Sequence, residues 1–427
     1  MTGNDRNALG IYVSIPFCRS KCTYCNFASG VYPAKDHERY VDRLIEDLSG
    51  ARSWATMISA QLPRCVDTVY LGGGTPSLLE PALLTRLFVA IQAQFELDAH
   101  AEITMECAPG QITDVTLNAM VAAGVNRVSL GVQSFVDSEA HASGRLHSHA
   151  IVEEDLRRLR AAGIANLNVD LIAGLPGQTF ASWEESLDAL IHSGVPHASV
   201  YMLEVDEDSR LGREMLKGAV RYRADLVPHD DAIARMYERA IERLESAGLC
   251  QYEISNFART GFESKHNMRY WQRRPYLGVG LDASSMLREA SFVSENMNRV
   301  EKKAKSPGAS APAGRLVVRF TTTDDLKEYL VGPATPEMTR LSPAQQLEEA
   351  WFLGLRMNEG VDPADLAKEF GSEMLEPATP VTERLIDDGL LIADRGRVQL
   401  TARGRLLSND VFQEFLETEV AAAVFEA

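Results

Sequence analysis

The sequence predicts an α/β fold: a partial (β/α)6 barrel followed by a smaller C-terminal domain of helices with a winged-helix-like hairpin. Two observations predict it. Short apolar runs alternate with amphipathic segments through the first half of the chain, and residues able to bind metals or polar ligands follow the ends of those runs. Because the loops after parallel strands meet at one end of a barrel, we expect these residues to share one site.

Six apolar runs are predicted to be strands, with helices between them. The runs span 11–17, 67–73, 101–107, 127–133, 166–174 and 197–205, and two of the clearest helices span 81–95 and 150–163. After the first, longer unit a strand returns about every 30 residues, which is the length of a βαβ unit. This order predicts parallel strands joined by right-handed crossovers.

The pattern changes after residue 205. A long amphipathic helix is expected over 228–248, and the segment 302–315 has the composition of a flexible linker. We therefore expect a barrel with its extension at 1–299, a linker or loop at 300–316 and a C-terminal domain at 317–427. In that domain Ser342 with Gln345 predicts a helix start, Asp362-Pro363 predicts a second, and a third helix is expected near 380–388. A hairpin is expected over 390–401.

Composition and charge exclude several classes of function. The chain has 427 residues, enough to bury a large core without disulfides, and its formal net charge of −17 makes nucleic acid and anionic membrane surfaces poor partners. The N-terminal residues MTGNDRNALG are polar, and no apolar run approaches the length of a membrane span. We expect no secretion, no integral membrane segment and a cytoplasmic location.

Three of the six cysteines lie on one short loop after the first predicted strand. Cys18, Cys22 and Cys25 have the spacing C-x3-C-x2-C. In a reducing compartment, clustered thiols are better explained as metal ligands or redox groups than as disulfides. Three thiolates can bind three corners of a cubane cluster and leave its fourth iron open to another ligand. A zinc site completed by a distant side chain, or unlinked core thiols, are the alternatives. The other cysteines are scattered singly and are expected in the core: Cys65, Cys107 and Cys250.

A glycine run, Gly72-Gly73-Gly74, ends the second predicted strand and is followed by Thr75 and Pro76. Glycines at a strand end let the backbone approach a ligand closely. A tight strand-to-helix turn is the alternative. The run is not a phosphate loop, because no Gly-Lys-Ser/Thr follows, and it lacks the spaced third glycine of a dinucleotide fingerprint.

Together, the cysteine loop and GGGTP resemble the radical S-adenosylmethionine (SAM) superfamily. The resemblance extends over nearly the whole chain to the family of oxygen-independent coproporphyrinogen oxidases and their haem-chaperone relatives. It is carried by YVSIPFCRSKCTYCNF, YLGGGTPS, ITMECAPG, RVSLGVQSF, GRLH, NVDLIAGLPGQT, YEISNFAR, HNMRYW, LGLRMNEGV and LTARGR.

This resemblance implies a [4Fe-4S] cluster on the three loop cysteines, SAM on its open iron, and an electron donor such as a flavodoxin or ferredoxin. The positions that match SAM contacts of the oxidase are Tyr12, Gly73, Gly74, Thr75, Glu106, Gln133, Arg145 and Asp170, and more loosely Tyr24, Glu204 and Ser284. The residue types suit the ligand, because carboxylates accept hydrogen bonds from ribose hydroxyls or an ammonium and arginine pairs with a carboxylate. Taken alone, Asp170 is equally well explained as a loop cap and Arg145 as a surface charge.

Two features favour the haem-chaperone branch over the oxidase branch. The oxidase has C-x3-C-x2-C-x-C, whereas this chain has Phe27 at the last position, and its first predicted strand starts near residue 11, which leaves no room for the oxidase's N-terminal arm. We therefore expect a haem chaperone without coproporphyrinogen oxidase activity, which passes haem to an acceptor protein that the sequence does not identify. The oxidase itself is the alternative.

The segment HNMRYW resembles the part of the chaperone branch implicated in haem binding. His266 is the candidate iron ligand, because a neutral imidazole is a good axial donor, and Tyr270 and Trp271 are expected to pack on the porphyrin. Three nearby arginines are candidates for pairing with its propionates: Arg269, Arg273 and Arg274. The alternative is that His266 holds a loop while the aromatic rings fill core. Ser284 stands where many members of that branch have histidine.

A winged-helix-like domain also suggests a different class, a redox-sensing DNA-binding regulator. From Ser342 to Ala427 the chain has 7 Lys and Arg against 17 Asp and Glu, a balance of −10. Such a surface repels DNA. We expect the domain instead to cover the barrel mouth or to contact the haem acceptor.

Overall fold

The structure, a computed structural model, describes residues 8–290, 316–332 and 336–416. Within these residues twelve strands form one sheet, in the order β12-β11-β10-β9-β1-β2-β3-β4-β5-β6-β8-β7. Six parallel strands form its centre, and each predicted run overlaps one of them: β1 (Leu9–Ile15), β2 (Cys65–Gly73), β3 (Glu96–Cys107), β4 (Arg127–Gln133), β5 (Asn166–Ala173) and β6 (His197–Met202).

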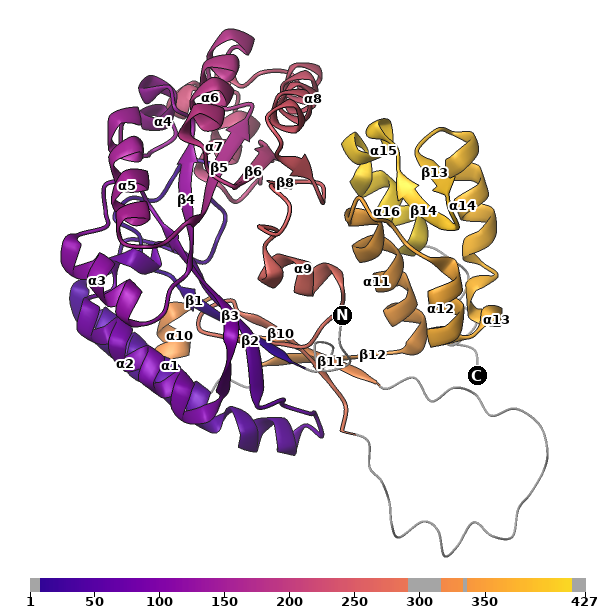
Figure 1. Cartoon of the computed structure of the whole chain (residues 1–427), viewed down its shortest axis with the longest axis horizontal. Coiled ribbons are helices and arrows are strands. Elements are labelled where there is room, and N and C mark those ends of the chain that lie inside the picture. The colour runs from indigo at the N-terminus through magenta and orange to yellow at the C-terminus, as the bar shows by residue number, and fades with distance from the viewer. Residues whose placement is uncertain (1–7, 291–315, 333–335, 417–427) are drawn as a thin grey trace, which may run out of the picture.

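Helices cover the outer face of these strands, which curve into a partial barrel (Figure 1). These helices pack on the sheet through an apolar face. In the helix at 149–161, for example, one face carries the buried side chains of Val152, Leu156 and Leu159. The predicted helices at 81–95, 150–163 and 228–248 correspond to α2, α5 and α8. The helices of this part are α1 (Ala34–Met57), α2 (Pro81–Gln94), α3 (Asp114–Ala122), α4 (Asp137–Ala142), α5 (His149–Ala161), α6 (Phe180–Ser193), α7 (Arg210–Leu216) and α8 (Asp230–Ser246).

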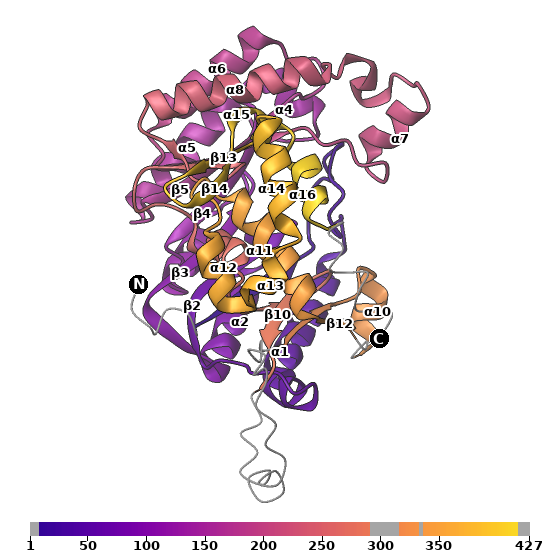
Figure 2. The same cartoon turned by 90° about the vertical axis from the view of Figure 1, so that its right-hand side faces the viewer.

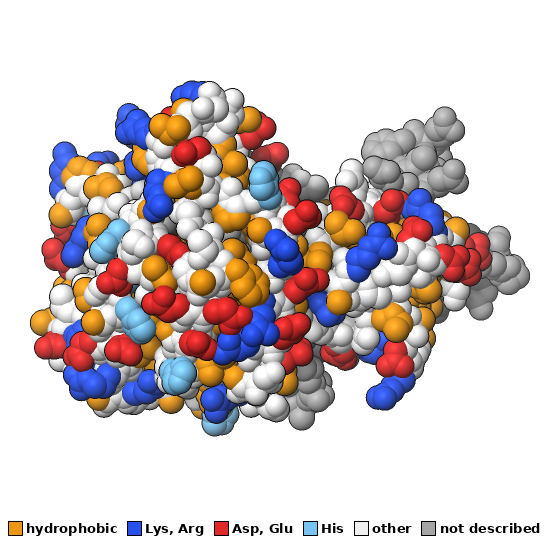
Figure 3. All heavy atoms as spheres, turned by 90° about the horizontal axis from the view of Figure 1, so that it is seen from above, with side chains coloured by type: hydrophobic (Ala, Val, Ile, Leu, Met, Phe, Trp, Pro, Cys, Tyr) orange, Lys and Arg blue, Asp and Glu red, His pale blue; other side chains and the backbone are white. Residues whose placement is uncertain are grey.

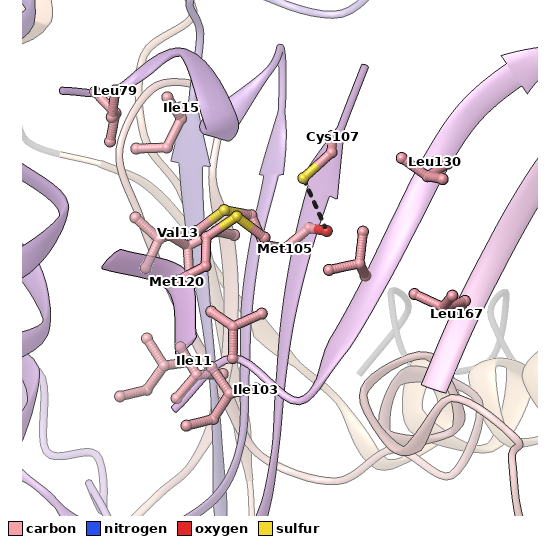
Figure 4. Close-up of a cluster of buried hydrophobic side chains, with 14 of the residues drawn as sticks. Ile11, Val13, Ile15, Leu79, Ile103, Met105, Cys107, Met120, Leu130 and Leu167 are labelled. Atoms are coloured by element: carbon pink, nitrogen blue, oxygen red, sulfur yellow. Dashed lines mark hydrogen bonds between the residues drawn. The ribbon is translucent and has the colours of Figure 1, made fainter. Parts of the chain in front are cut away.

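The main core lies between the parallel strands and these helices. Ile11, Val13 and Ile15 alternate along β1 and are fully buried, and Figure 4 shows them beside Met105 of β3 and Met120 of α3. Because side chains alternate across a strand, the residues between them face the inside of the barrel. Of the single cysteines only Cys107 is buried, as expected. The expectation is wrong for the other two, Cys65 and Cys250, which are exposed at the first residues of β2 and β7.

The sheet continues past both edges of the barrel, which the hydrophobic pattern does not predict. On one side β9 (Tyr276–Val279) pairs with β1 in parallel, followed by antiparallel β10 (Ser284–Arg288), β11 (Val317–Thr321) and β12 (Glu337–Leu341). On the other side lie β8 (Asn256–Ala258) and β7 (Cys250–Gln251). Because 317–341 is hydrogen-bonded into this sheet, the C-terminal domain begins near residue 342 and not at 317. Apart from Leu316, the linker expected at 300–316 lies outside the described residues.

The C-terminal domain has a second core, formed around Trp351, Leu355 and Phe415. Its helices and hairpin agree with the predictions, including the capping box of Ser342 and Gln345. Figures 1 and 2 show it alongside the barrel strands. In Figure 1, α9 (Lys265–Trp271) lies between the two parts, and it contacts α11. Its elements are α11 (Pro343–Arg356), α12 (Pro363–Phe370), α13 (Ser372–Leu375), α14 (Ala378–Asp387), β13 (Leu391–Asp394), β14 (Arg397–Leu400), α15 (Ala402–Leu406) and α16 (Ser408–Leu416), and α10 (Leu326–Val331) packs on α1.

Candidate cofactor site at the barrel mouth

The cysteine loop follows β1 and folds back against it. The N–H of Cys18 donates to the carbonyl of Gly30 at 2.8 Å, and the N–H of Gly30 donates to the carbonyl of Pro16 at 2.9 Å. These bonds close the base of the loop. They hold the thiols of Cys18, Cys22 and Cys25 half-buried, and all three line the same cavity.

The thiols fit an iron–sulfur cluster by number, chemistry and shared cavity. Burial raises the pKa of the Cys18 thiol, and Cys25 and Cys22 raise it further. A thiolate in such a place is stabilised by a bound metal. Among the described residues no three His, Cys, Asp or Glu side chains are arranged around a single ion. This does not argue against a cluster, because in a cluster each cysteine binds a different iron and the three thiols need not surround one ion.

The glycine run packs directly against the cysteine loop. The N–H of Gly74 donates to the carbonyl of Ile15, and the N–H of Thr75 donates to the carbonyl of Phe17, both at 2.8 Å. A Cβ added at Gly74 would lie 2.8 Å from each of these two oxygens, so a side chain does not fit there. Gly73 has a φ of 101°, which glycine adopts without strain. The glycine run therefore holds its own loop against the cysteine loop, and it also leaves backbone groups accessible to a ligand.

These two loops form one wall of a cavity of about 960 Å³ at the C-terminal ends of the parallel strands. Most of the predicted cofactor residues line it: Cys18, Cys22, Cys25, Tyr24, Gly73, Gly74, Thr75, Glu106, Gln133, Arg145, Asp170 and Glu204. Two are absent from the lining that the structure describes. Tyr12 lies inside the barrel with its ring stacked on Tyr70, and Ser284 is exposed on β10, where its hydroxyl lies 2.9 Å from that of Thr321.

Glu106 lies near the end of β3, next to the glycine run. Its Oε1 accepts from the Tyr70 hydroxyl at 2.8 Å, and its Oε2 accepts from the N–H of Gly73 at 3.1 Å. Burial is the main cause that raises the pKa of Glu106 to about 7, and the nearby Asp170 adds to it. A ligand that brings positive charge beside this carboxyl therefore favours its ionised form.

Asp170 lies within β5 and does not cap a loop. Its Oδ1 accepts from Asn168 Nδ2 at 2.7 Å, and its Oδ2 accepts from Ser129 Oγ at 3.1 Å. Burial raises the pKa of Asp170 as well. The carboxylate of Asp170 is thus held in position by hydrogen bonds from Asn168 and Ser129 in the barrel interior.

Arg145 and Gln133 complete the polar wall. Arg145 is not a surface charge, because it donates to the Tyr24 hydroxyl at 3.1 Å inside the cavity. It packs closely on Gly131, where an added Cβ would lie 2.9 Å from the guanidinium. Gln133 has a φ of 71°, which is uncommon for a residue with a side chain. Its buried Oε1 has no hydrogen-bond partner among the described residues. Backbone strain and an unpaired buried oxygen are typical of ligand contacts.

The C-terminal domain closes one side of the cavity, as expected of a domain that covers the barrel mouth. It contributes 406–410 and Arg356, the last residue of α11. No local pattern marks these residues, because they reach the site only through packing between the two parts of the chain. Tyr70 was also not predicted, although it lies two residues before Gly72 and so on the same face of β2.

Comparison with known proteins identifies the family. The Radical SAM superfamily profile matches residues 12–190, and the HemN C-terminal domain profile matches 341–407. The chain is 32% identical to the heme chaperone HemW of Lactococcus lactis subsp. lactis, over 96% of this chain and 97% of that protein. It is 30% identical to the heme chaperone HemW of Bacillus subtilis, over 95% and 98%. The chain belongs to the HemW family.

A solved structure confirms the fold of this HemW-family chain. Coproporphyrinogen III oxidase (HemN) from Escherichia coli matches with a TM-score of 0.77 and 22% identity, over 96% of this chain and 90% of that one. This likeness confirms the partial barrel and its C-terminal domain. Membership of the radical SAM superfamily confirms two predicted cofactors, a [4Fe-4S] cluster and SAM.

The segment HNMRYW forms α9, and its histidine points into the barrel. His266 is 1% exposed, with Nδ1 2.9 Å from Thr68 Oγ1 and Nε2 2.8 Å from the Tyr270 hydroxyl. Burial lowers the pKa of His266 to about 3, so the imidazole is neutral. The alternative interpretation has His266 holding a loop; here its hydrogen-bond partners are instead Thr68 of β2 and Tyr270 of α9 itself.

The arginines of this segment have protein partners. Arg269 is 0% exposed, pairs with Asp67, and donates to the carbonyls of Ala8 at 2.8 Å and Pro275 at 2.9 Å. The expectation that Arg269 pairs with a propionate is therefore wrong, because it is a saturated core residue. The other two are paired with acidic side chains: Arg274 with Asp67 at 2.6 Å and Arg273 with Glu369 at 2.7 Å.

Trp271 lies on the opposite side of α9 from this core. It lines a second cavity, of about 720 Å³, whose other walls come from β10, α11 and α12. The guanidinium carbon of Arg356 lies 4.3 Å from the centroid of its ring. Met286 and Phe370 add apolar surface to this cavity. The segment thus places its histidine in the barrel and its tryptophan in a cleft.

The surface agrees with the charge balance. On the face shown in Figure 3, Lys and Arg side chains alternate with Asp and Glu, and the described residues form no extended basic area there. Over the part of the chain that the structure describes, no helix is both long and apolar enough to cross a bilayer.

Proposed function

We propose that this protein is a haem chaperone that binds a [4Fe-4S] cluster, SAM and haem and passes haem to an acceptor protein. The observation that carries the proposal is the similarity, over nearly the whole chain, to proteins named heme chaperone HemW. The cavity that joins three thiols to the glycine run and to Glu106 and Asp170 supports the cofactor part.

We propose that Cys18, Cys22 and Cys25 hold the cluster and that the cavity wall holds SAM. When bound, the cluster and SAM supply the electron-transfer and radical chemistry of the superfamily. The chain's own groups bind and orient: Glu106 and Asp170 accept hydrogen bonds from an ammonium or ribose hydroxyls, and Arg145 pairs with a carboxylate. The remaining proposed contacts are Tyr24, Gly73, Gly74, Thr75, Gln133 and Glu204. Tyr12 and Ser284 lie outside the lining and are assigned no contact.

We propose that haem binds beside α9, with Trp271 against the porphyrin and His266 as the iron ligand. Because His266 faces the barrel and Trp271 faces the cleft on the other side of α9, one haem can contact both only if α9 moves away from β2. The neutral imidazole of His266 needs no proton loss to bind iron. Its Nε2, however, is occupied by the Tyr270 hydroxyl at 2.8 Å. Ligation therefore requires that this hydrogen bond break and that the buried His266 side chain become accessible to haem. A variant can remove the first of these two costs.

Titrating haemin into wild type, Tyr270→Phe and His266→Ala tests this placement, with the Soret band as the readout. Tyr270→Phe removes the bond on Nε2 and keeps the ring, so we expect about fivefold tighter binding. His266→Ala should bind more weakly and shift the Soret maximum. If both variants bind haemin as wild type does, the chaperone proposal survives and His266 is a core residue.

The second candidate function is oxygen-independent coproporphyrinogen III oxidase, because its chemistry would use the same SAM cavity. Against it, Phe27 stands where the oxidase pattern has a fourth cysteine, and this residue is 62% exposed on the loop. Anaerobic incubation with SAM, a reductant and coproporphyrinogen III should give no protoporphyrinogen. Decarboxylation above that of a cluster-free control would return the protein to the oxidase branch. The acidic C-terminal domain gives no support to a DNA-binding regulator.

We further propose a cytoplasmic location and two protein partners. One is the haem acceptor. The other is an electron donor of the flavodoxin or ferredoxin type that approaches the exposed side of the cysteine loop, where Phe27 lies.

A further inference from the structure

A chain of hydrogen bonds crosses the barrel interior from Asp170 to the start of α9. Asp170 Oδ1 lies 2.7 Å from Asn168 Nδ2, and Asn168 Oδ1 lies 2.6 Å from His197 Nδ1. His197 Nε2 lies 2.9 Å from the Tyr252 hydroxyl, which in turn accepts from the N–H of Ser264 at 3.2 Å. The links come from β5, β6, the segment after β7 and the residue before α9.

The direction of every bond in this chain is determined. The amide nitrogen of Asn168 must face Asp170, because the opposite orientation would set two oxygens against each other. Its oxygen therefore accepts from His197, whose Nδ1 carries the proton and whose Nε2 accepts from Tyr252. The hydroxyl oxygen of Tyr252 is then free to accept from Ser264. All donors point toward the carboxylate, an arrangement in which each bond polarises the next.

Three of the five residues in the chain are buried, and Asp170 and Tyr252 are half-buried. Asn168 is 2% exposed, and His197 and Ser264 are 0% exposed. Burial, with the charge of Arg127, holds the pKa of His197 well below its usual range, so the imidazole keeps one proton. Burying so many polar groups costs free energy unless all are satisfied, and a network of this kind fixes one geometry.

The two ends of the chain lie at places with different roles. Asp170 lines the cofactor cavity. At the other end the Ser264 hydroxyl caps α9 by accepting from the N–H of Asn267 at 3.3 Å. The carbonyl of Tyr252 also accepts from the N–H of Asn358, after α11, at 3.0 Å. The hydrogen bonds therefore connect Asp170 to the start of α9 and to a segment that contacts the C-terminal domain.

We propose that His197 and Tyr252 are positioning residues for Asp170, and that through them SAM binding orders the start of α9. This inference rests on the proposed SAM site. A ligand that hydrogen-bonds to Asp170 fixes its carboxylate, and the aligned donors behind it then hold Tyr252 and Ser264 more firmly. By linkage, whatever holds α9 in place favours SAM binding to the same extent.

Tyr252→Phe tests this, because it removes one hydroxyl and keeps the ring. In the full-length, anaerobically reconstituted protein we expect SAM affinity to fall about fivefold. We also expect SAM to slow amide hydrogen exchange of 264–267 in wild type but not in the variant. His197→Leu breaks the chain at its centre and should cause both losses. The matched control is Tyr329→Phe, which removes a buried hydroxyl that donates to Asp47 of α1; neither residue lines the cavity.

The outcomes separate this inference from the proposed site. If wild type binds SAM, and Tyr252→Phe keeps both its SAM affinity and the slowed exchange, the chain is only structural and the inference is overturned. If wild type does not bind SAM at all, the proposed SAM site fails as well. A loss of affinity shared equally by Tyr329→Phe would show a general effect of lost stability, and would also overturn it.

Discussion

Glu106 shows how burial sets the chemistry of single residues in this site. Its carboxyl accepts from Tyr70 and from the N–H of Gly73, yet burial and Asp170 still raise its pKa to about 7. This pKa is above the ordinary value of 4.5, so the folded state binds the proton of Glu106 more tightly than the unfolded state does. Protonated Glu106 therefore favours the folded state at low pH, and this contribution to stability is lost as pH rises from about 4.5 to about 7. Between pH 6 and 8 the same group changes the charge of the cavity.

This predicts a pH-dependent affinity for SAM. Ionised Glu106 favours a cationic ligand, and at pH 6 most of the carboxyl must first lose its proton. Affinity should therefore fall about tenfold from pH 8 to pH 6, which calorimetry on the reconstituted protein measures. The groups around Glu106 are Tyr70, Asp170 and Arg145. Glu106→Gln should abolish the slope, and Glu204→Gln, in the same cavity, should keep it. A flat profile in wild type would contradict this.

Part of the site could be predicted at this scale and part could not. Glu106 and Asp170 follow from the strand pattern, since a polar residue late in a buried parallel strand faces the barrel mouth. The orientation of His266 does not, because it depends on Thr68 and on the burial of Arg269, which are set by the packing of α9 on β2.

Among elements, the cysteine loop contributes little to the main core. Its base is closed by backbone bonds between Cys18, Gly30 and Pro16, and only Phe17 at its start and the partly buried Ala28 pack with the core of β1. The edge strands show the limit of prediction at this scale. β7 has two residues and β8 has three, too few for any alternating pattern, and they exist because β6 offers an edge to pair with.

Cys22→Ser should therefore remove the cluster and leave the fold. We expect iron and sulfide to fall to background in anaerobically reconstituted protein, with an unchanged far-UV circular dichroism spectrum, because loops tolerate change better than core. Cys250→Ser, exposed at the sheet edge, is the control and should keep its iron. A Cys22→Ser protein with full iron and sulfide would remove these thiols from the cluster site.

At the scale of the whole molecule, an ion pair with a fully buried carboxylate links the barrel part to the C-terminal domain. Glu253 is 0% exposed and accepts from Arg356 at 2.9 Å, and the N–H of Ile254 donates to the carbonyl of Arg356. The pair lies between the cavity that Arg356 lines and the cleft that Trp271 lines. The two domains themselves could be predicted from composition, but their boundary and this contact could not, because both depend on pairing between distant segments.

Arg356→Met should destabilise the protein by about 3 kcal/mol at neutral pH, because it leaves a buried carboxylate without its partner. Urea unfolding measures this. Burial already raises the pKa of Glu253, so the carboxyl takes up a proton more readily as pH falls and the loss of stability should become smaller. Adding Glu253→Gln should restore part of the stability. Arg384→Met, which breaks an exposed pair with Glu414, should change stability by no more than about 0.5 kcal/mol. Equal effects of the two single variants would contradict the role of the buried pair.

The association of cluster and SAM in one cavity is tested most directly by electron paramagnetic resonance of the reduced, anaerobically reconstituted protein, recorded with and without SAM. We predict the signal of a reduced [4Fe-4S] cluster whose g values shift when SAM is added, because three cysteines would leave one iron of a cluster open to another ligand, and they line the same cavity as Gly73, Glu106 and Asp170. Stoichiometric zinc with no cluster signal, or a cluster signal that SAM leaves unchanged, would contradict it.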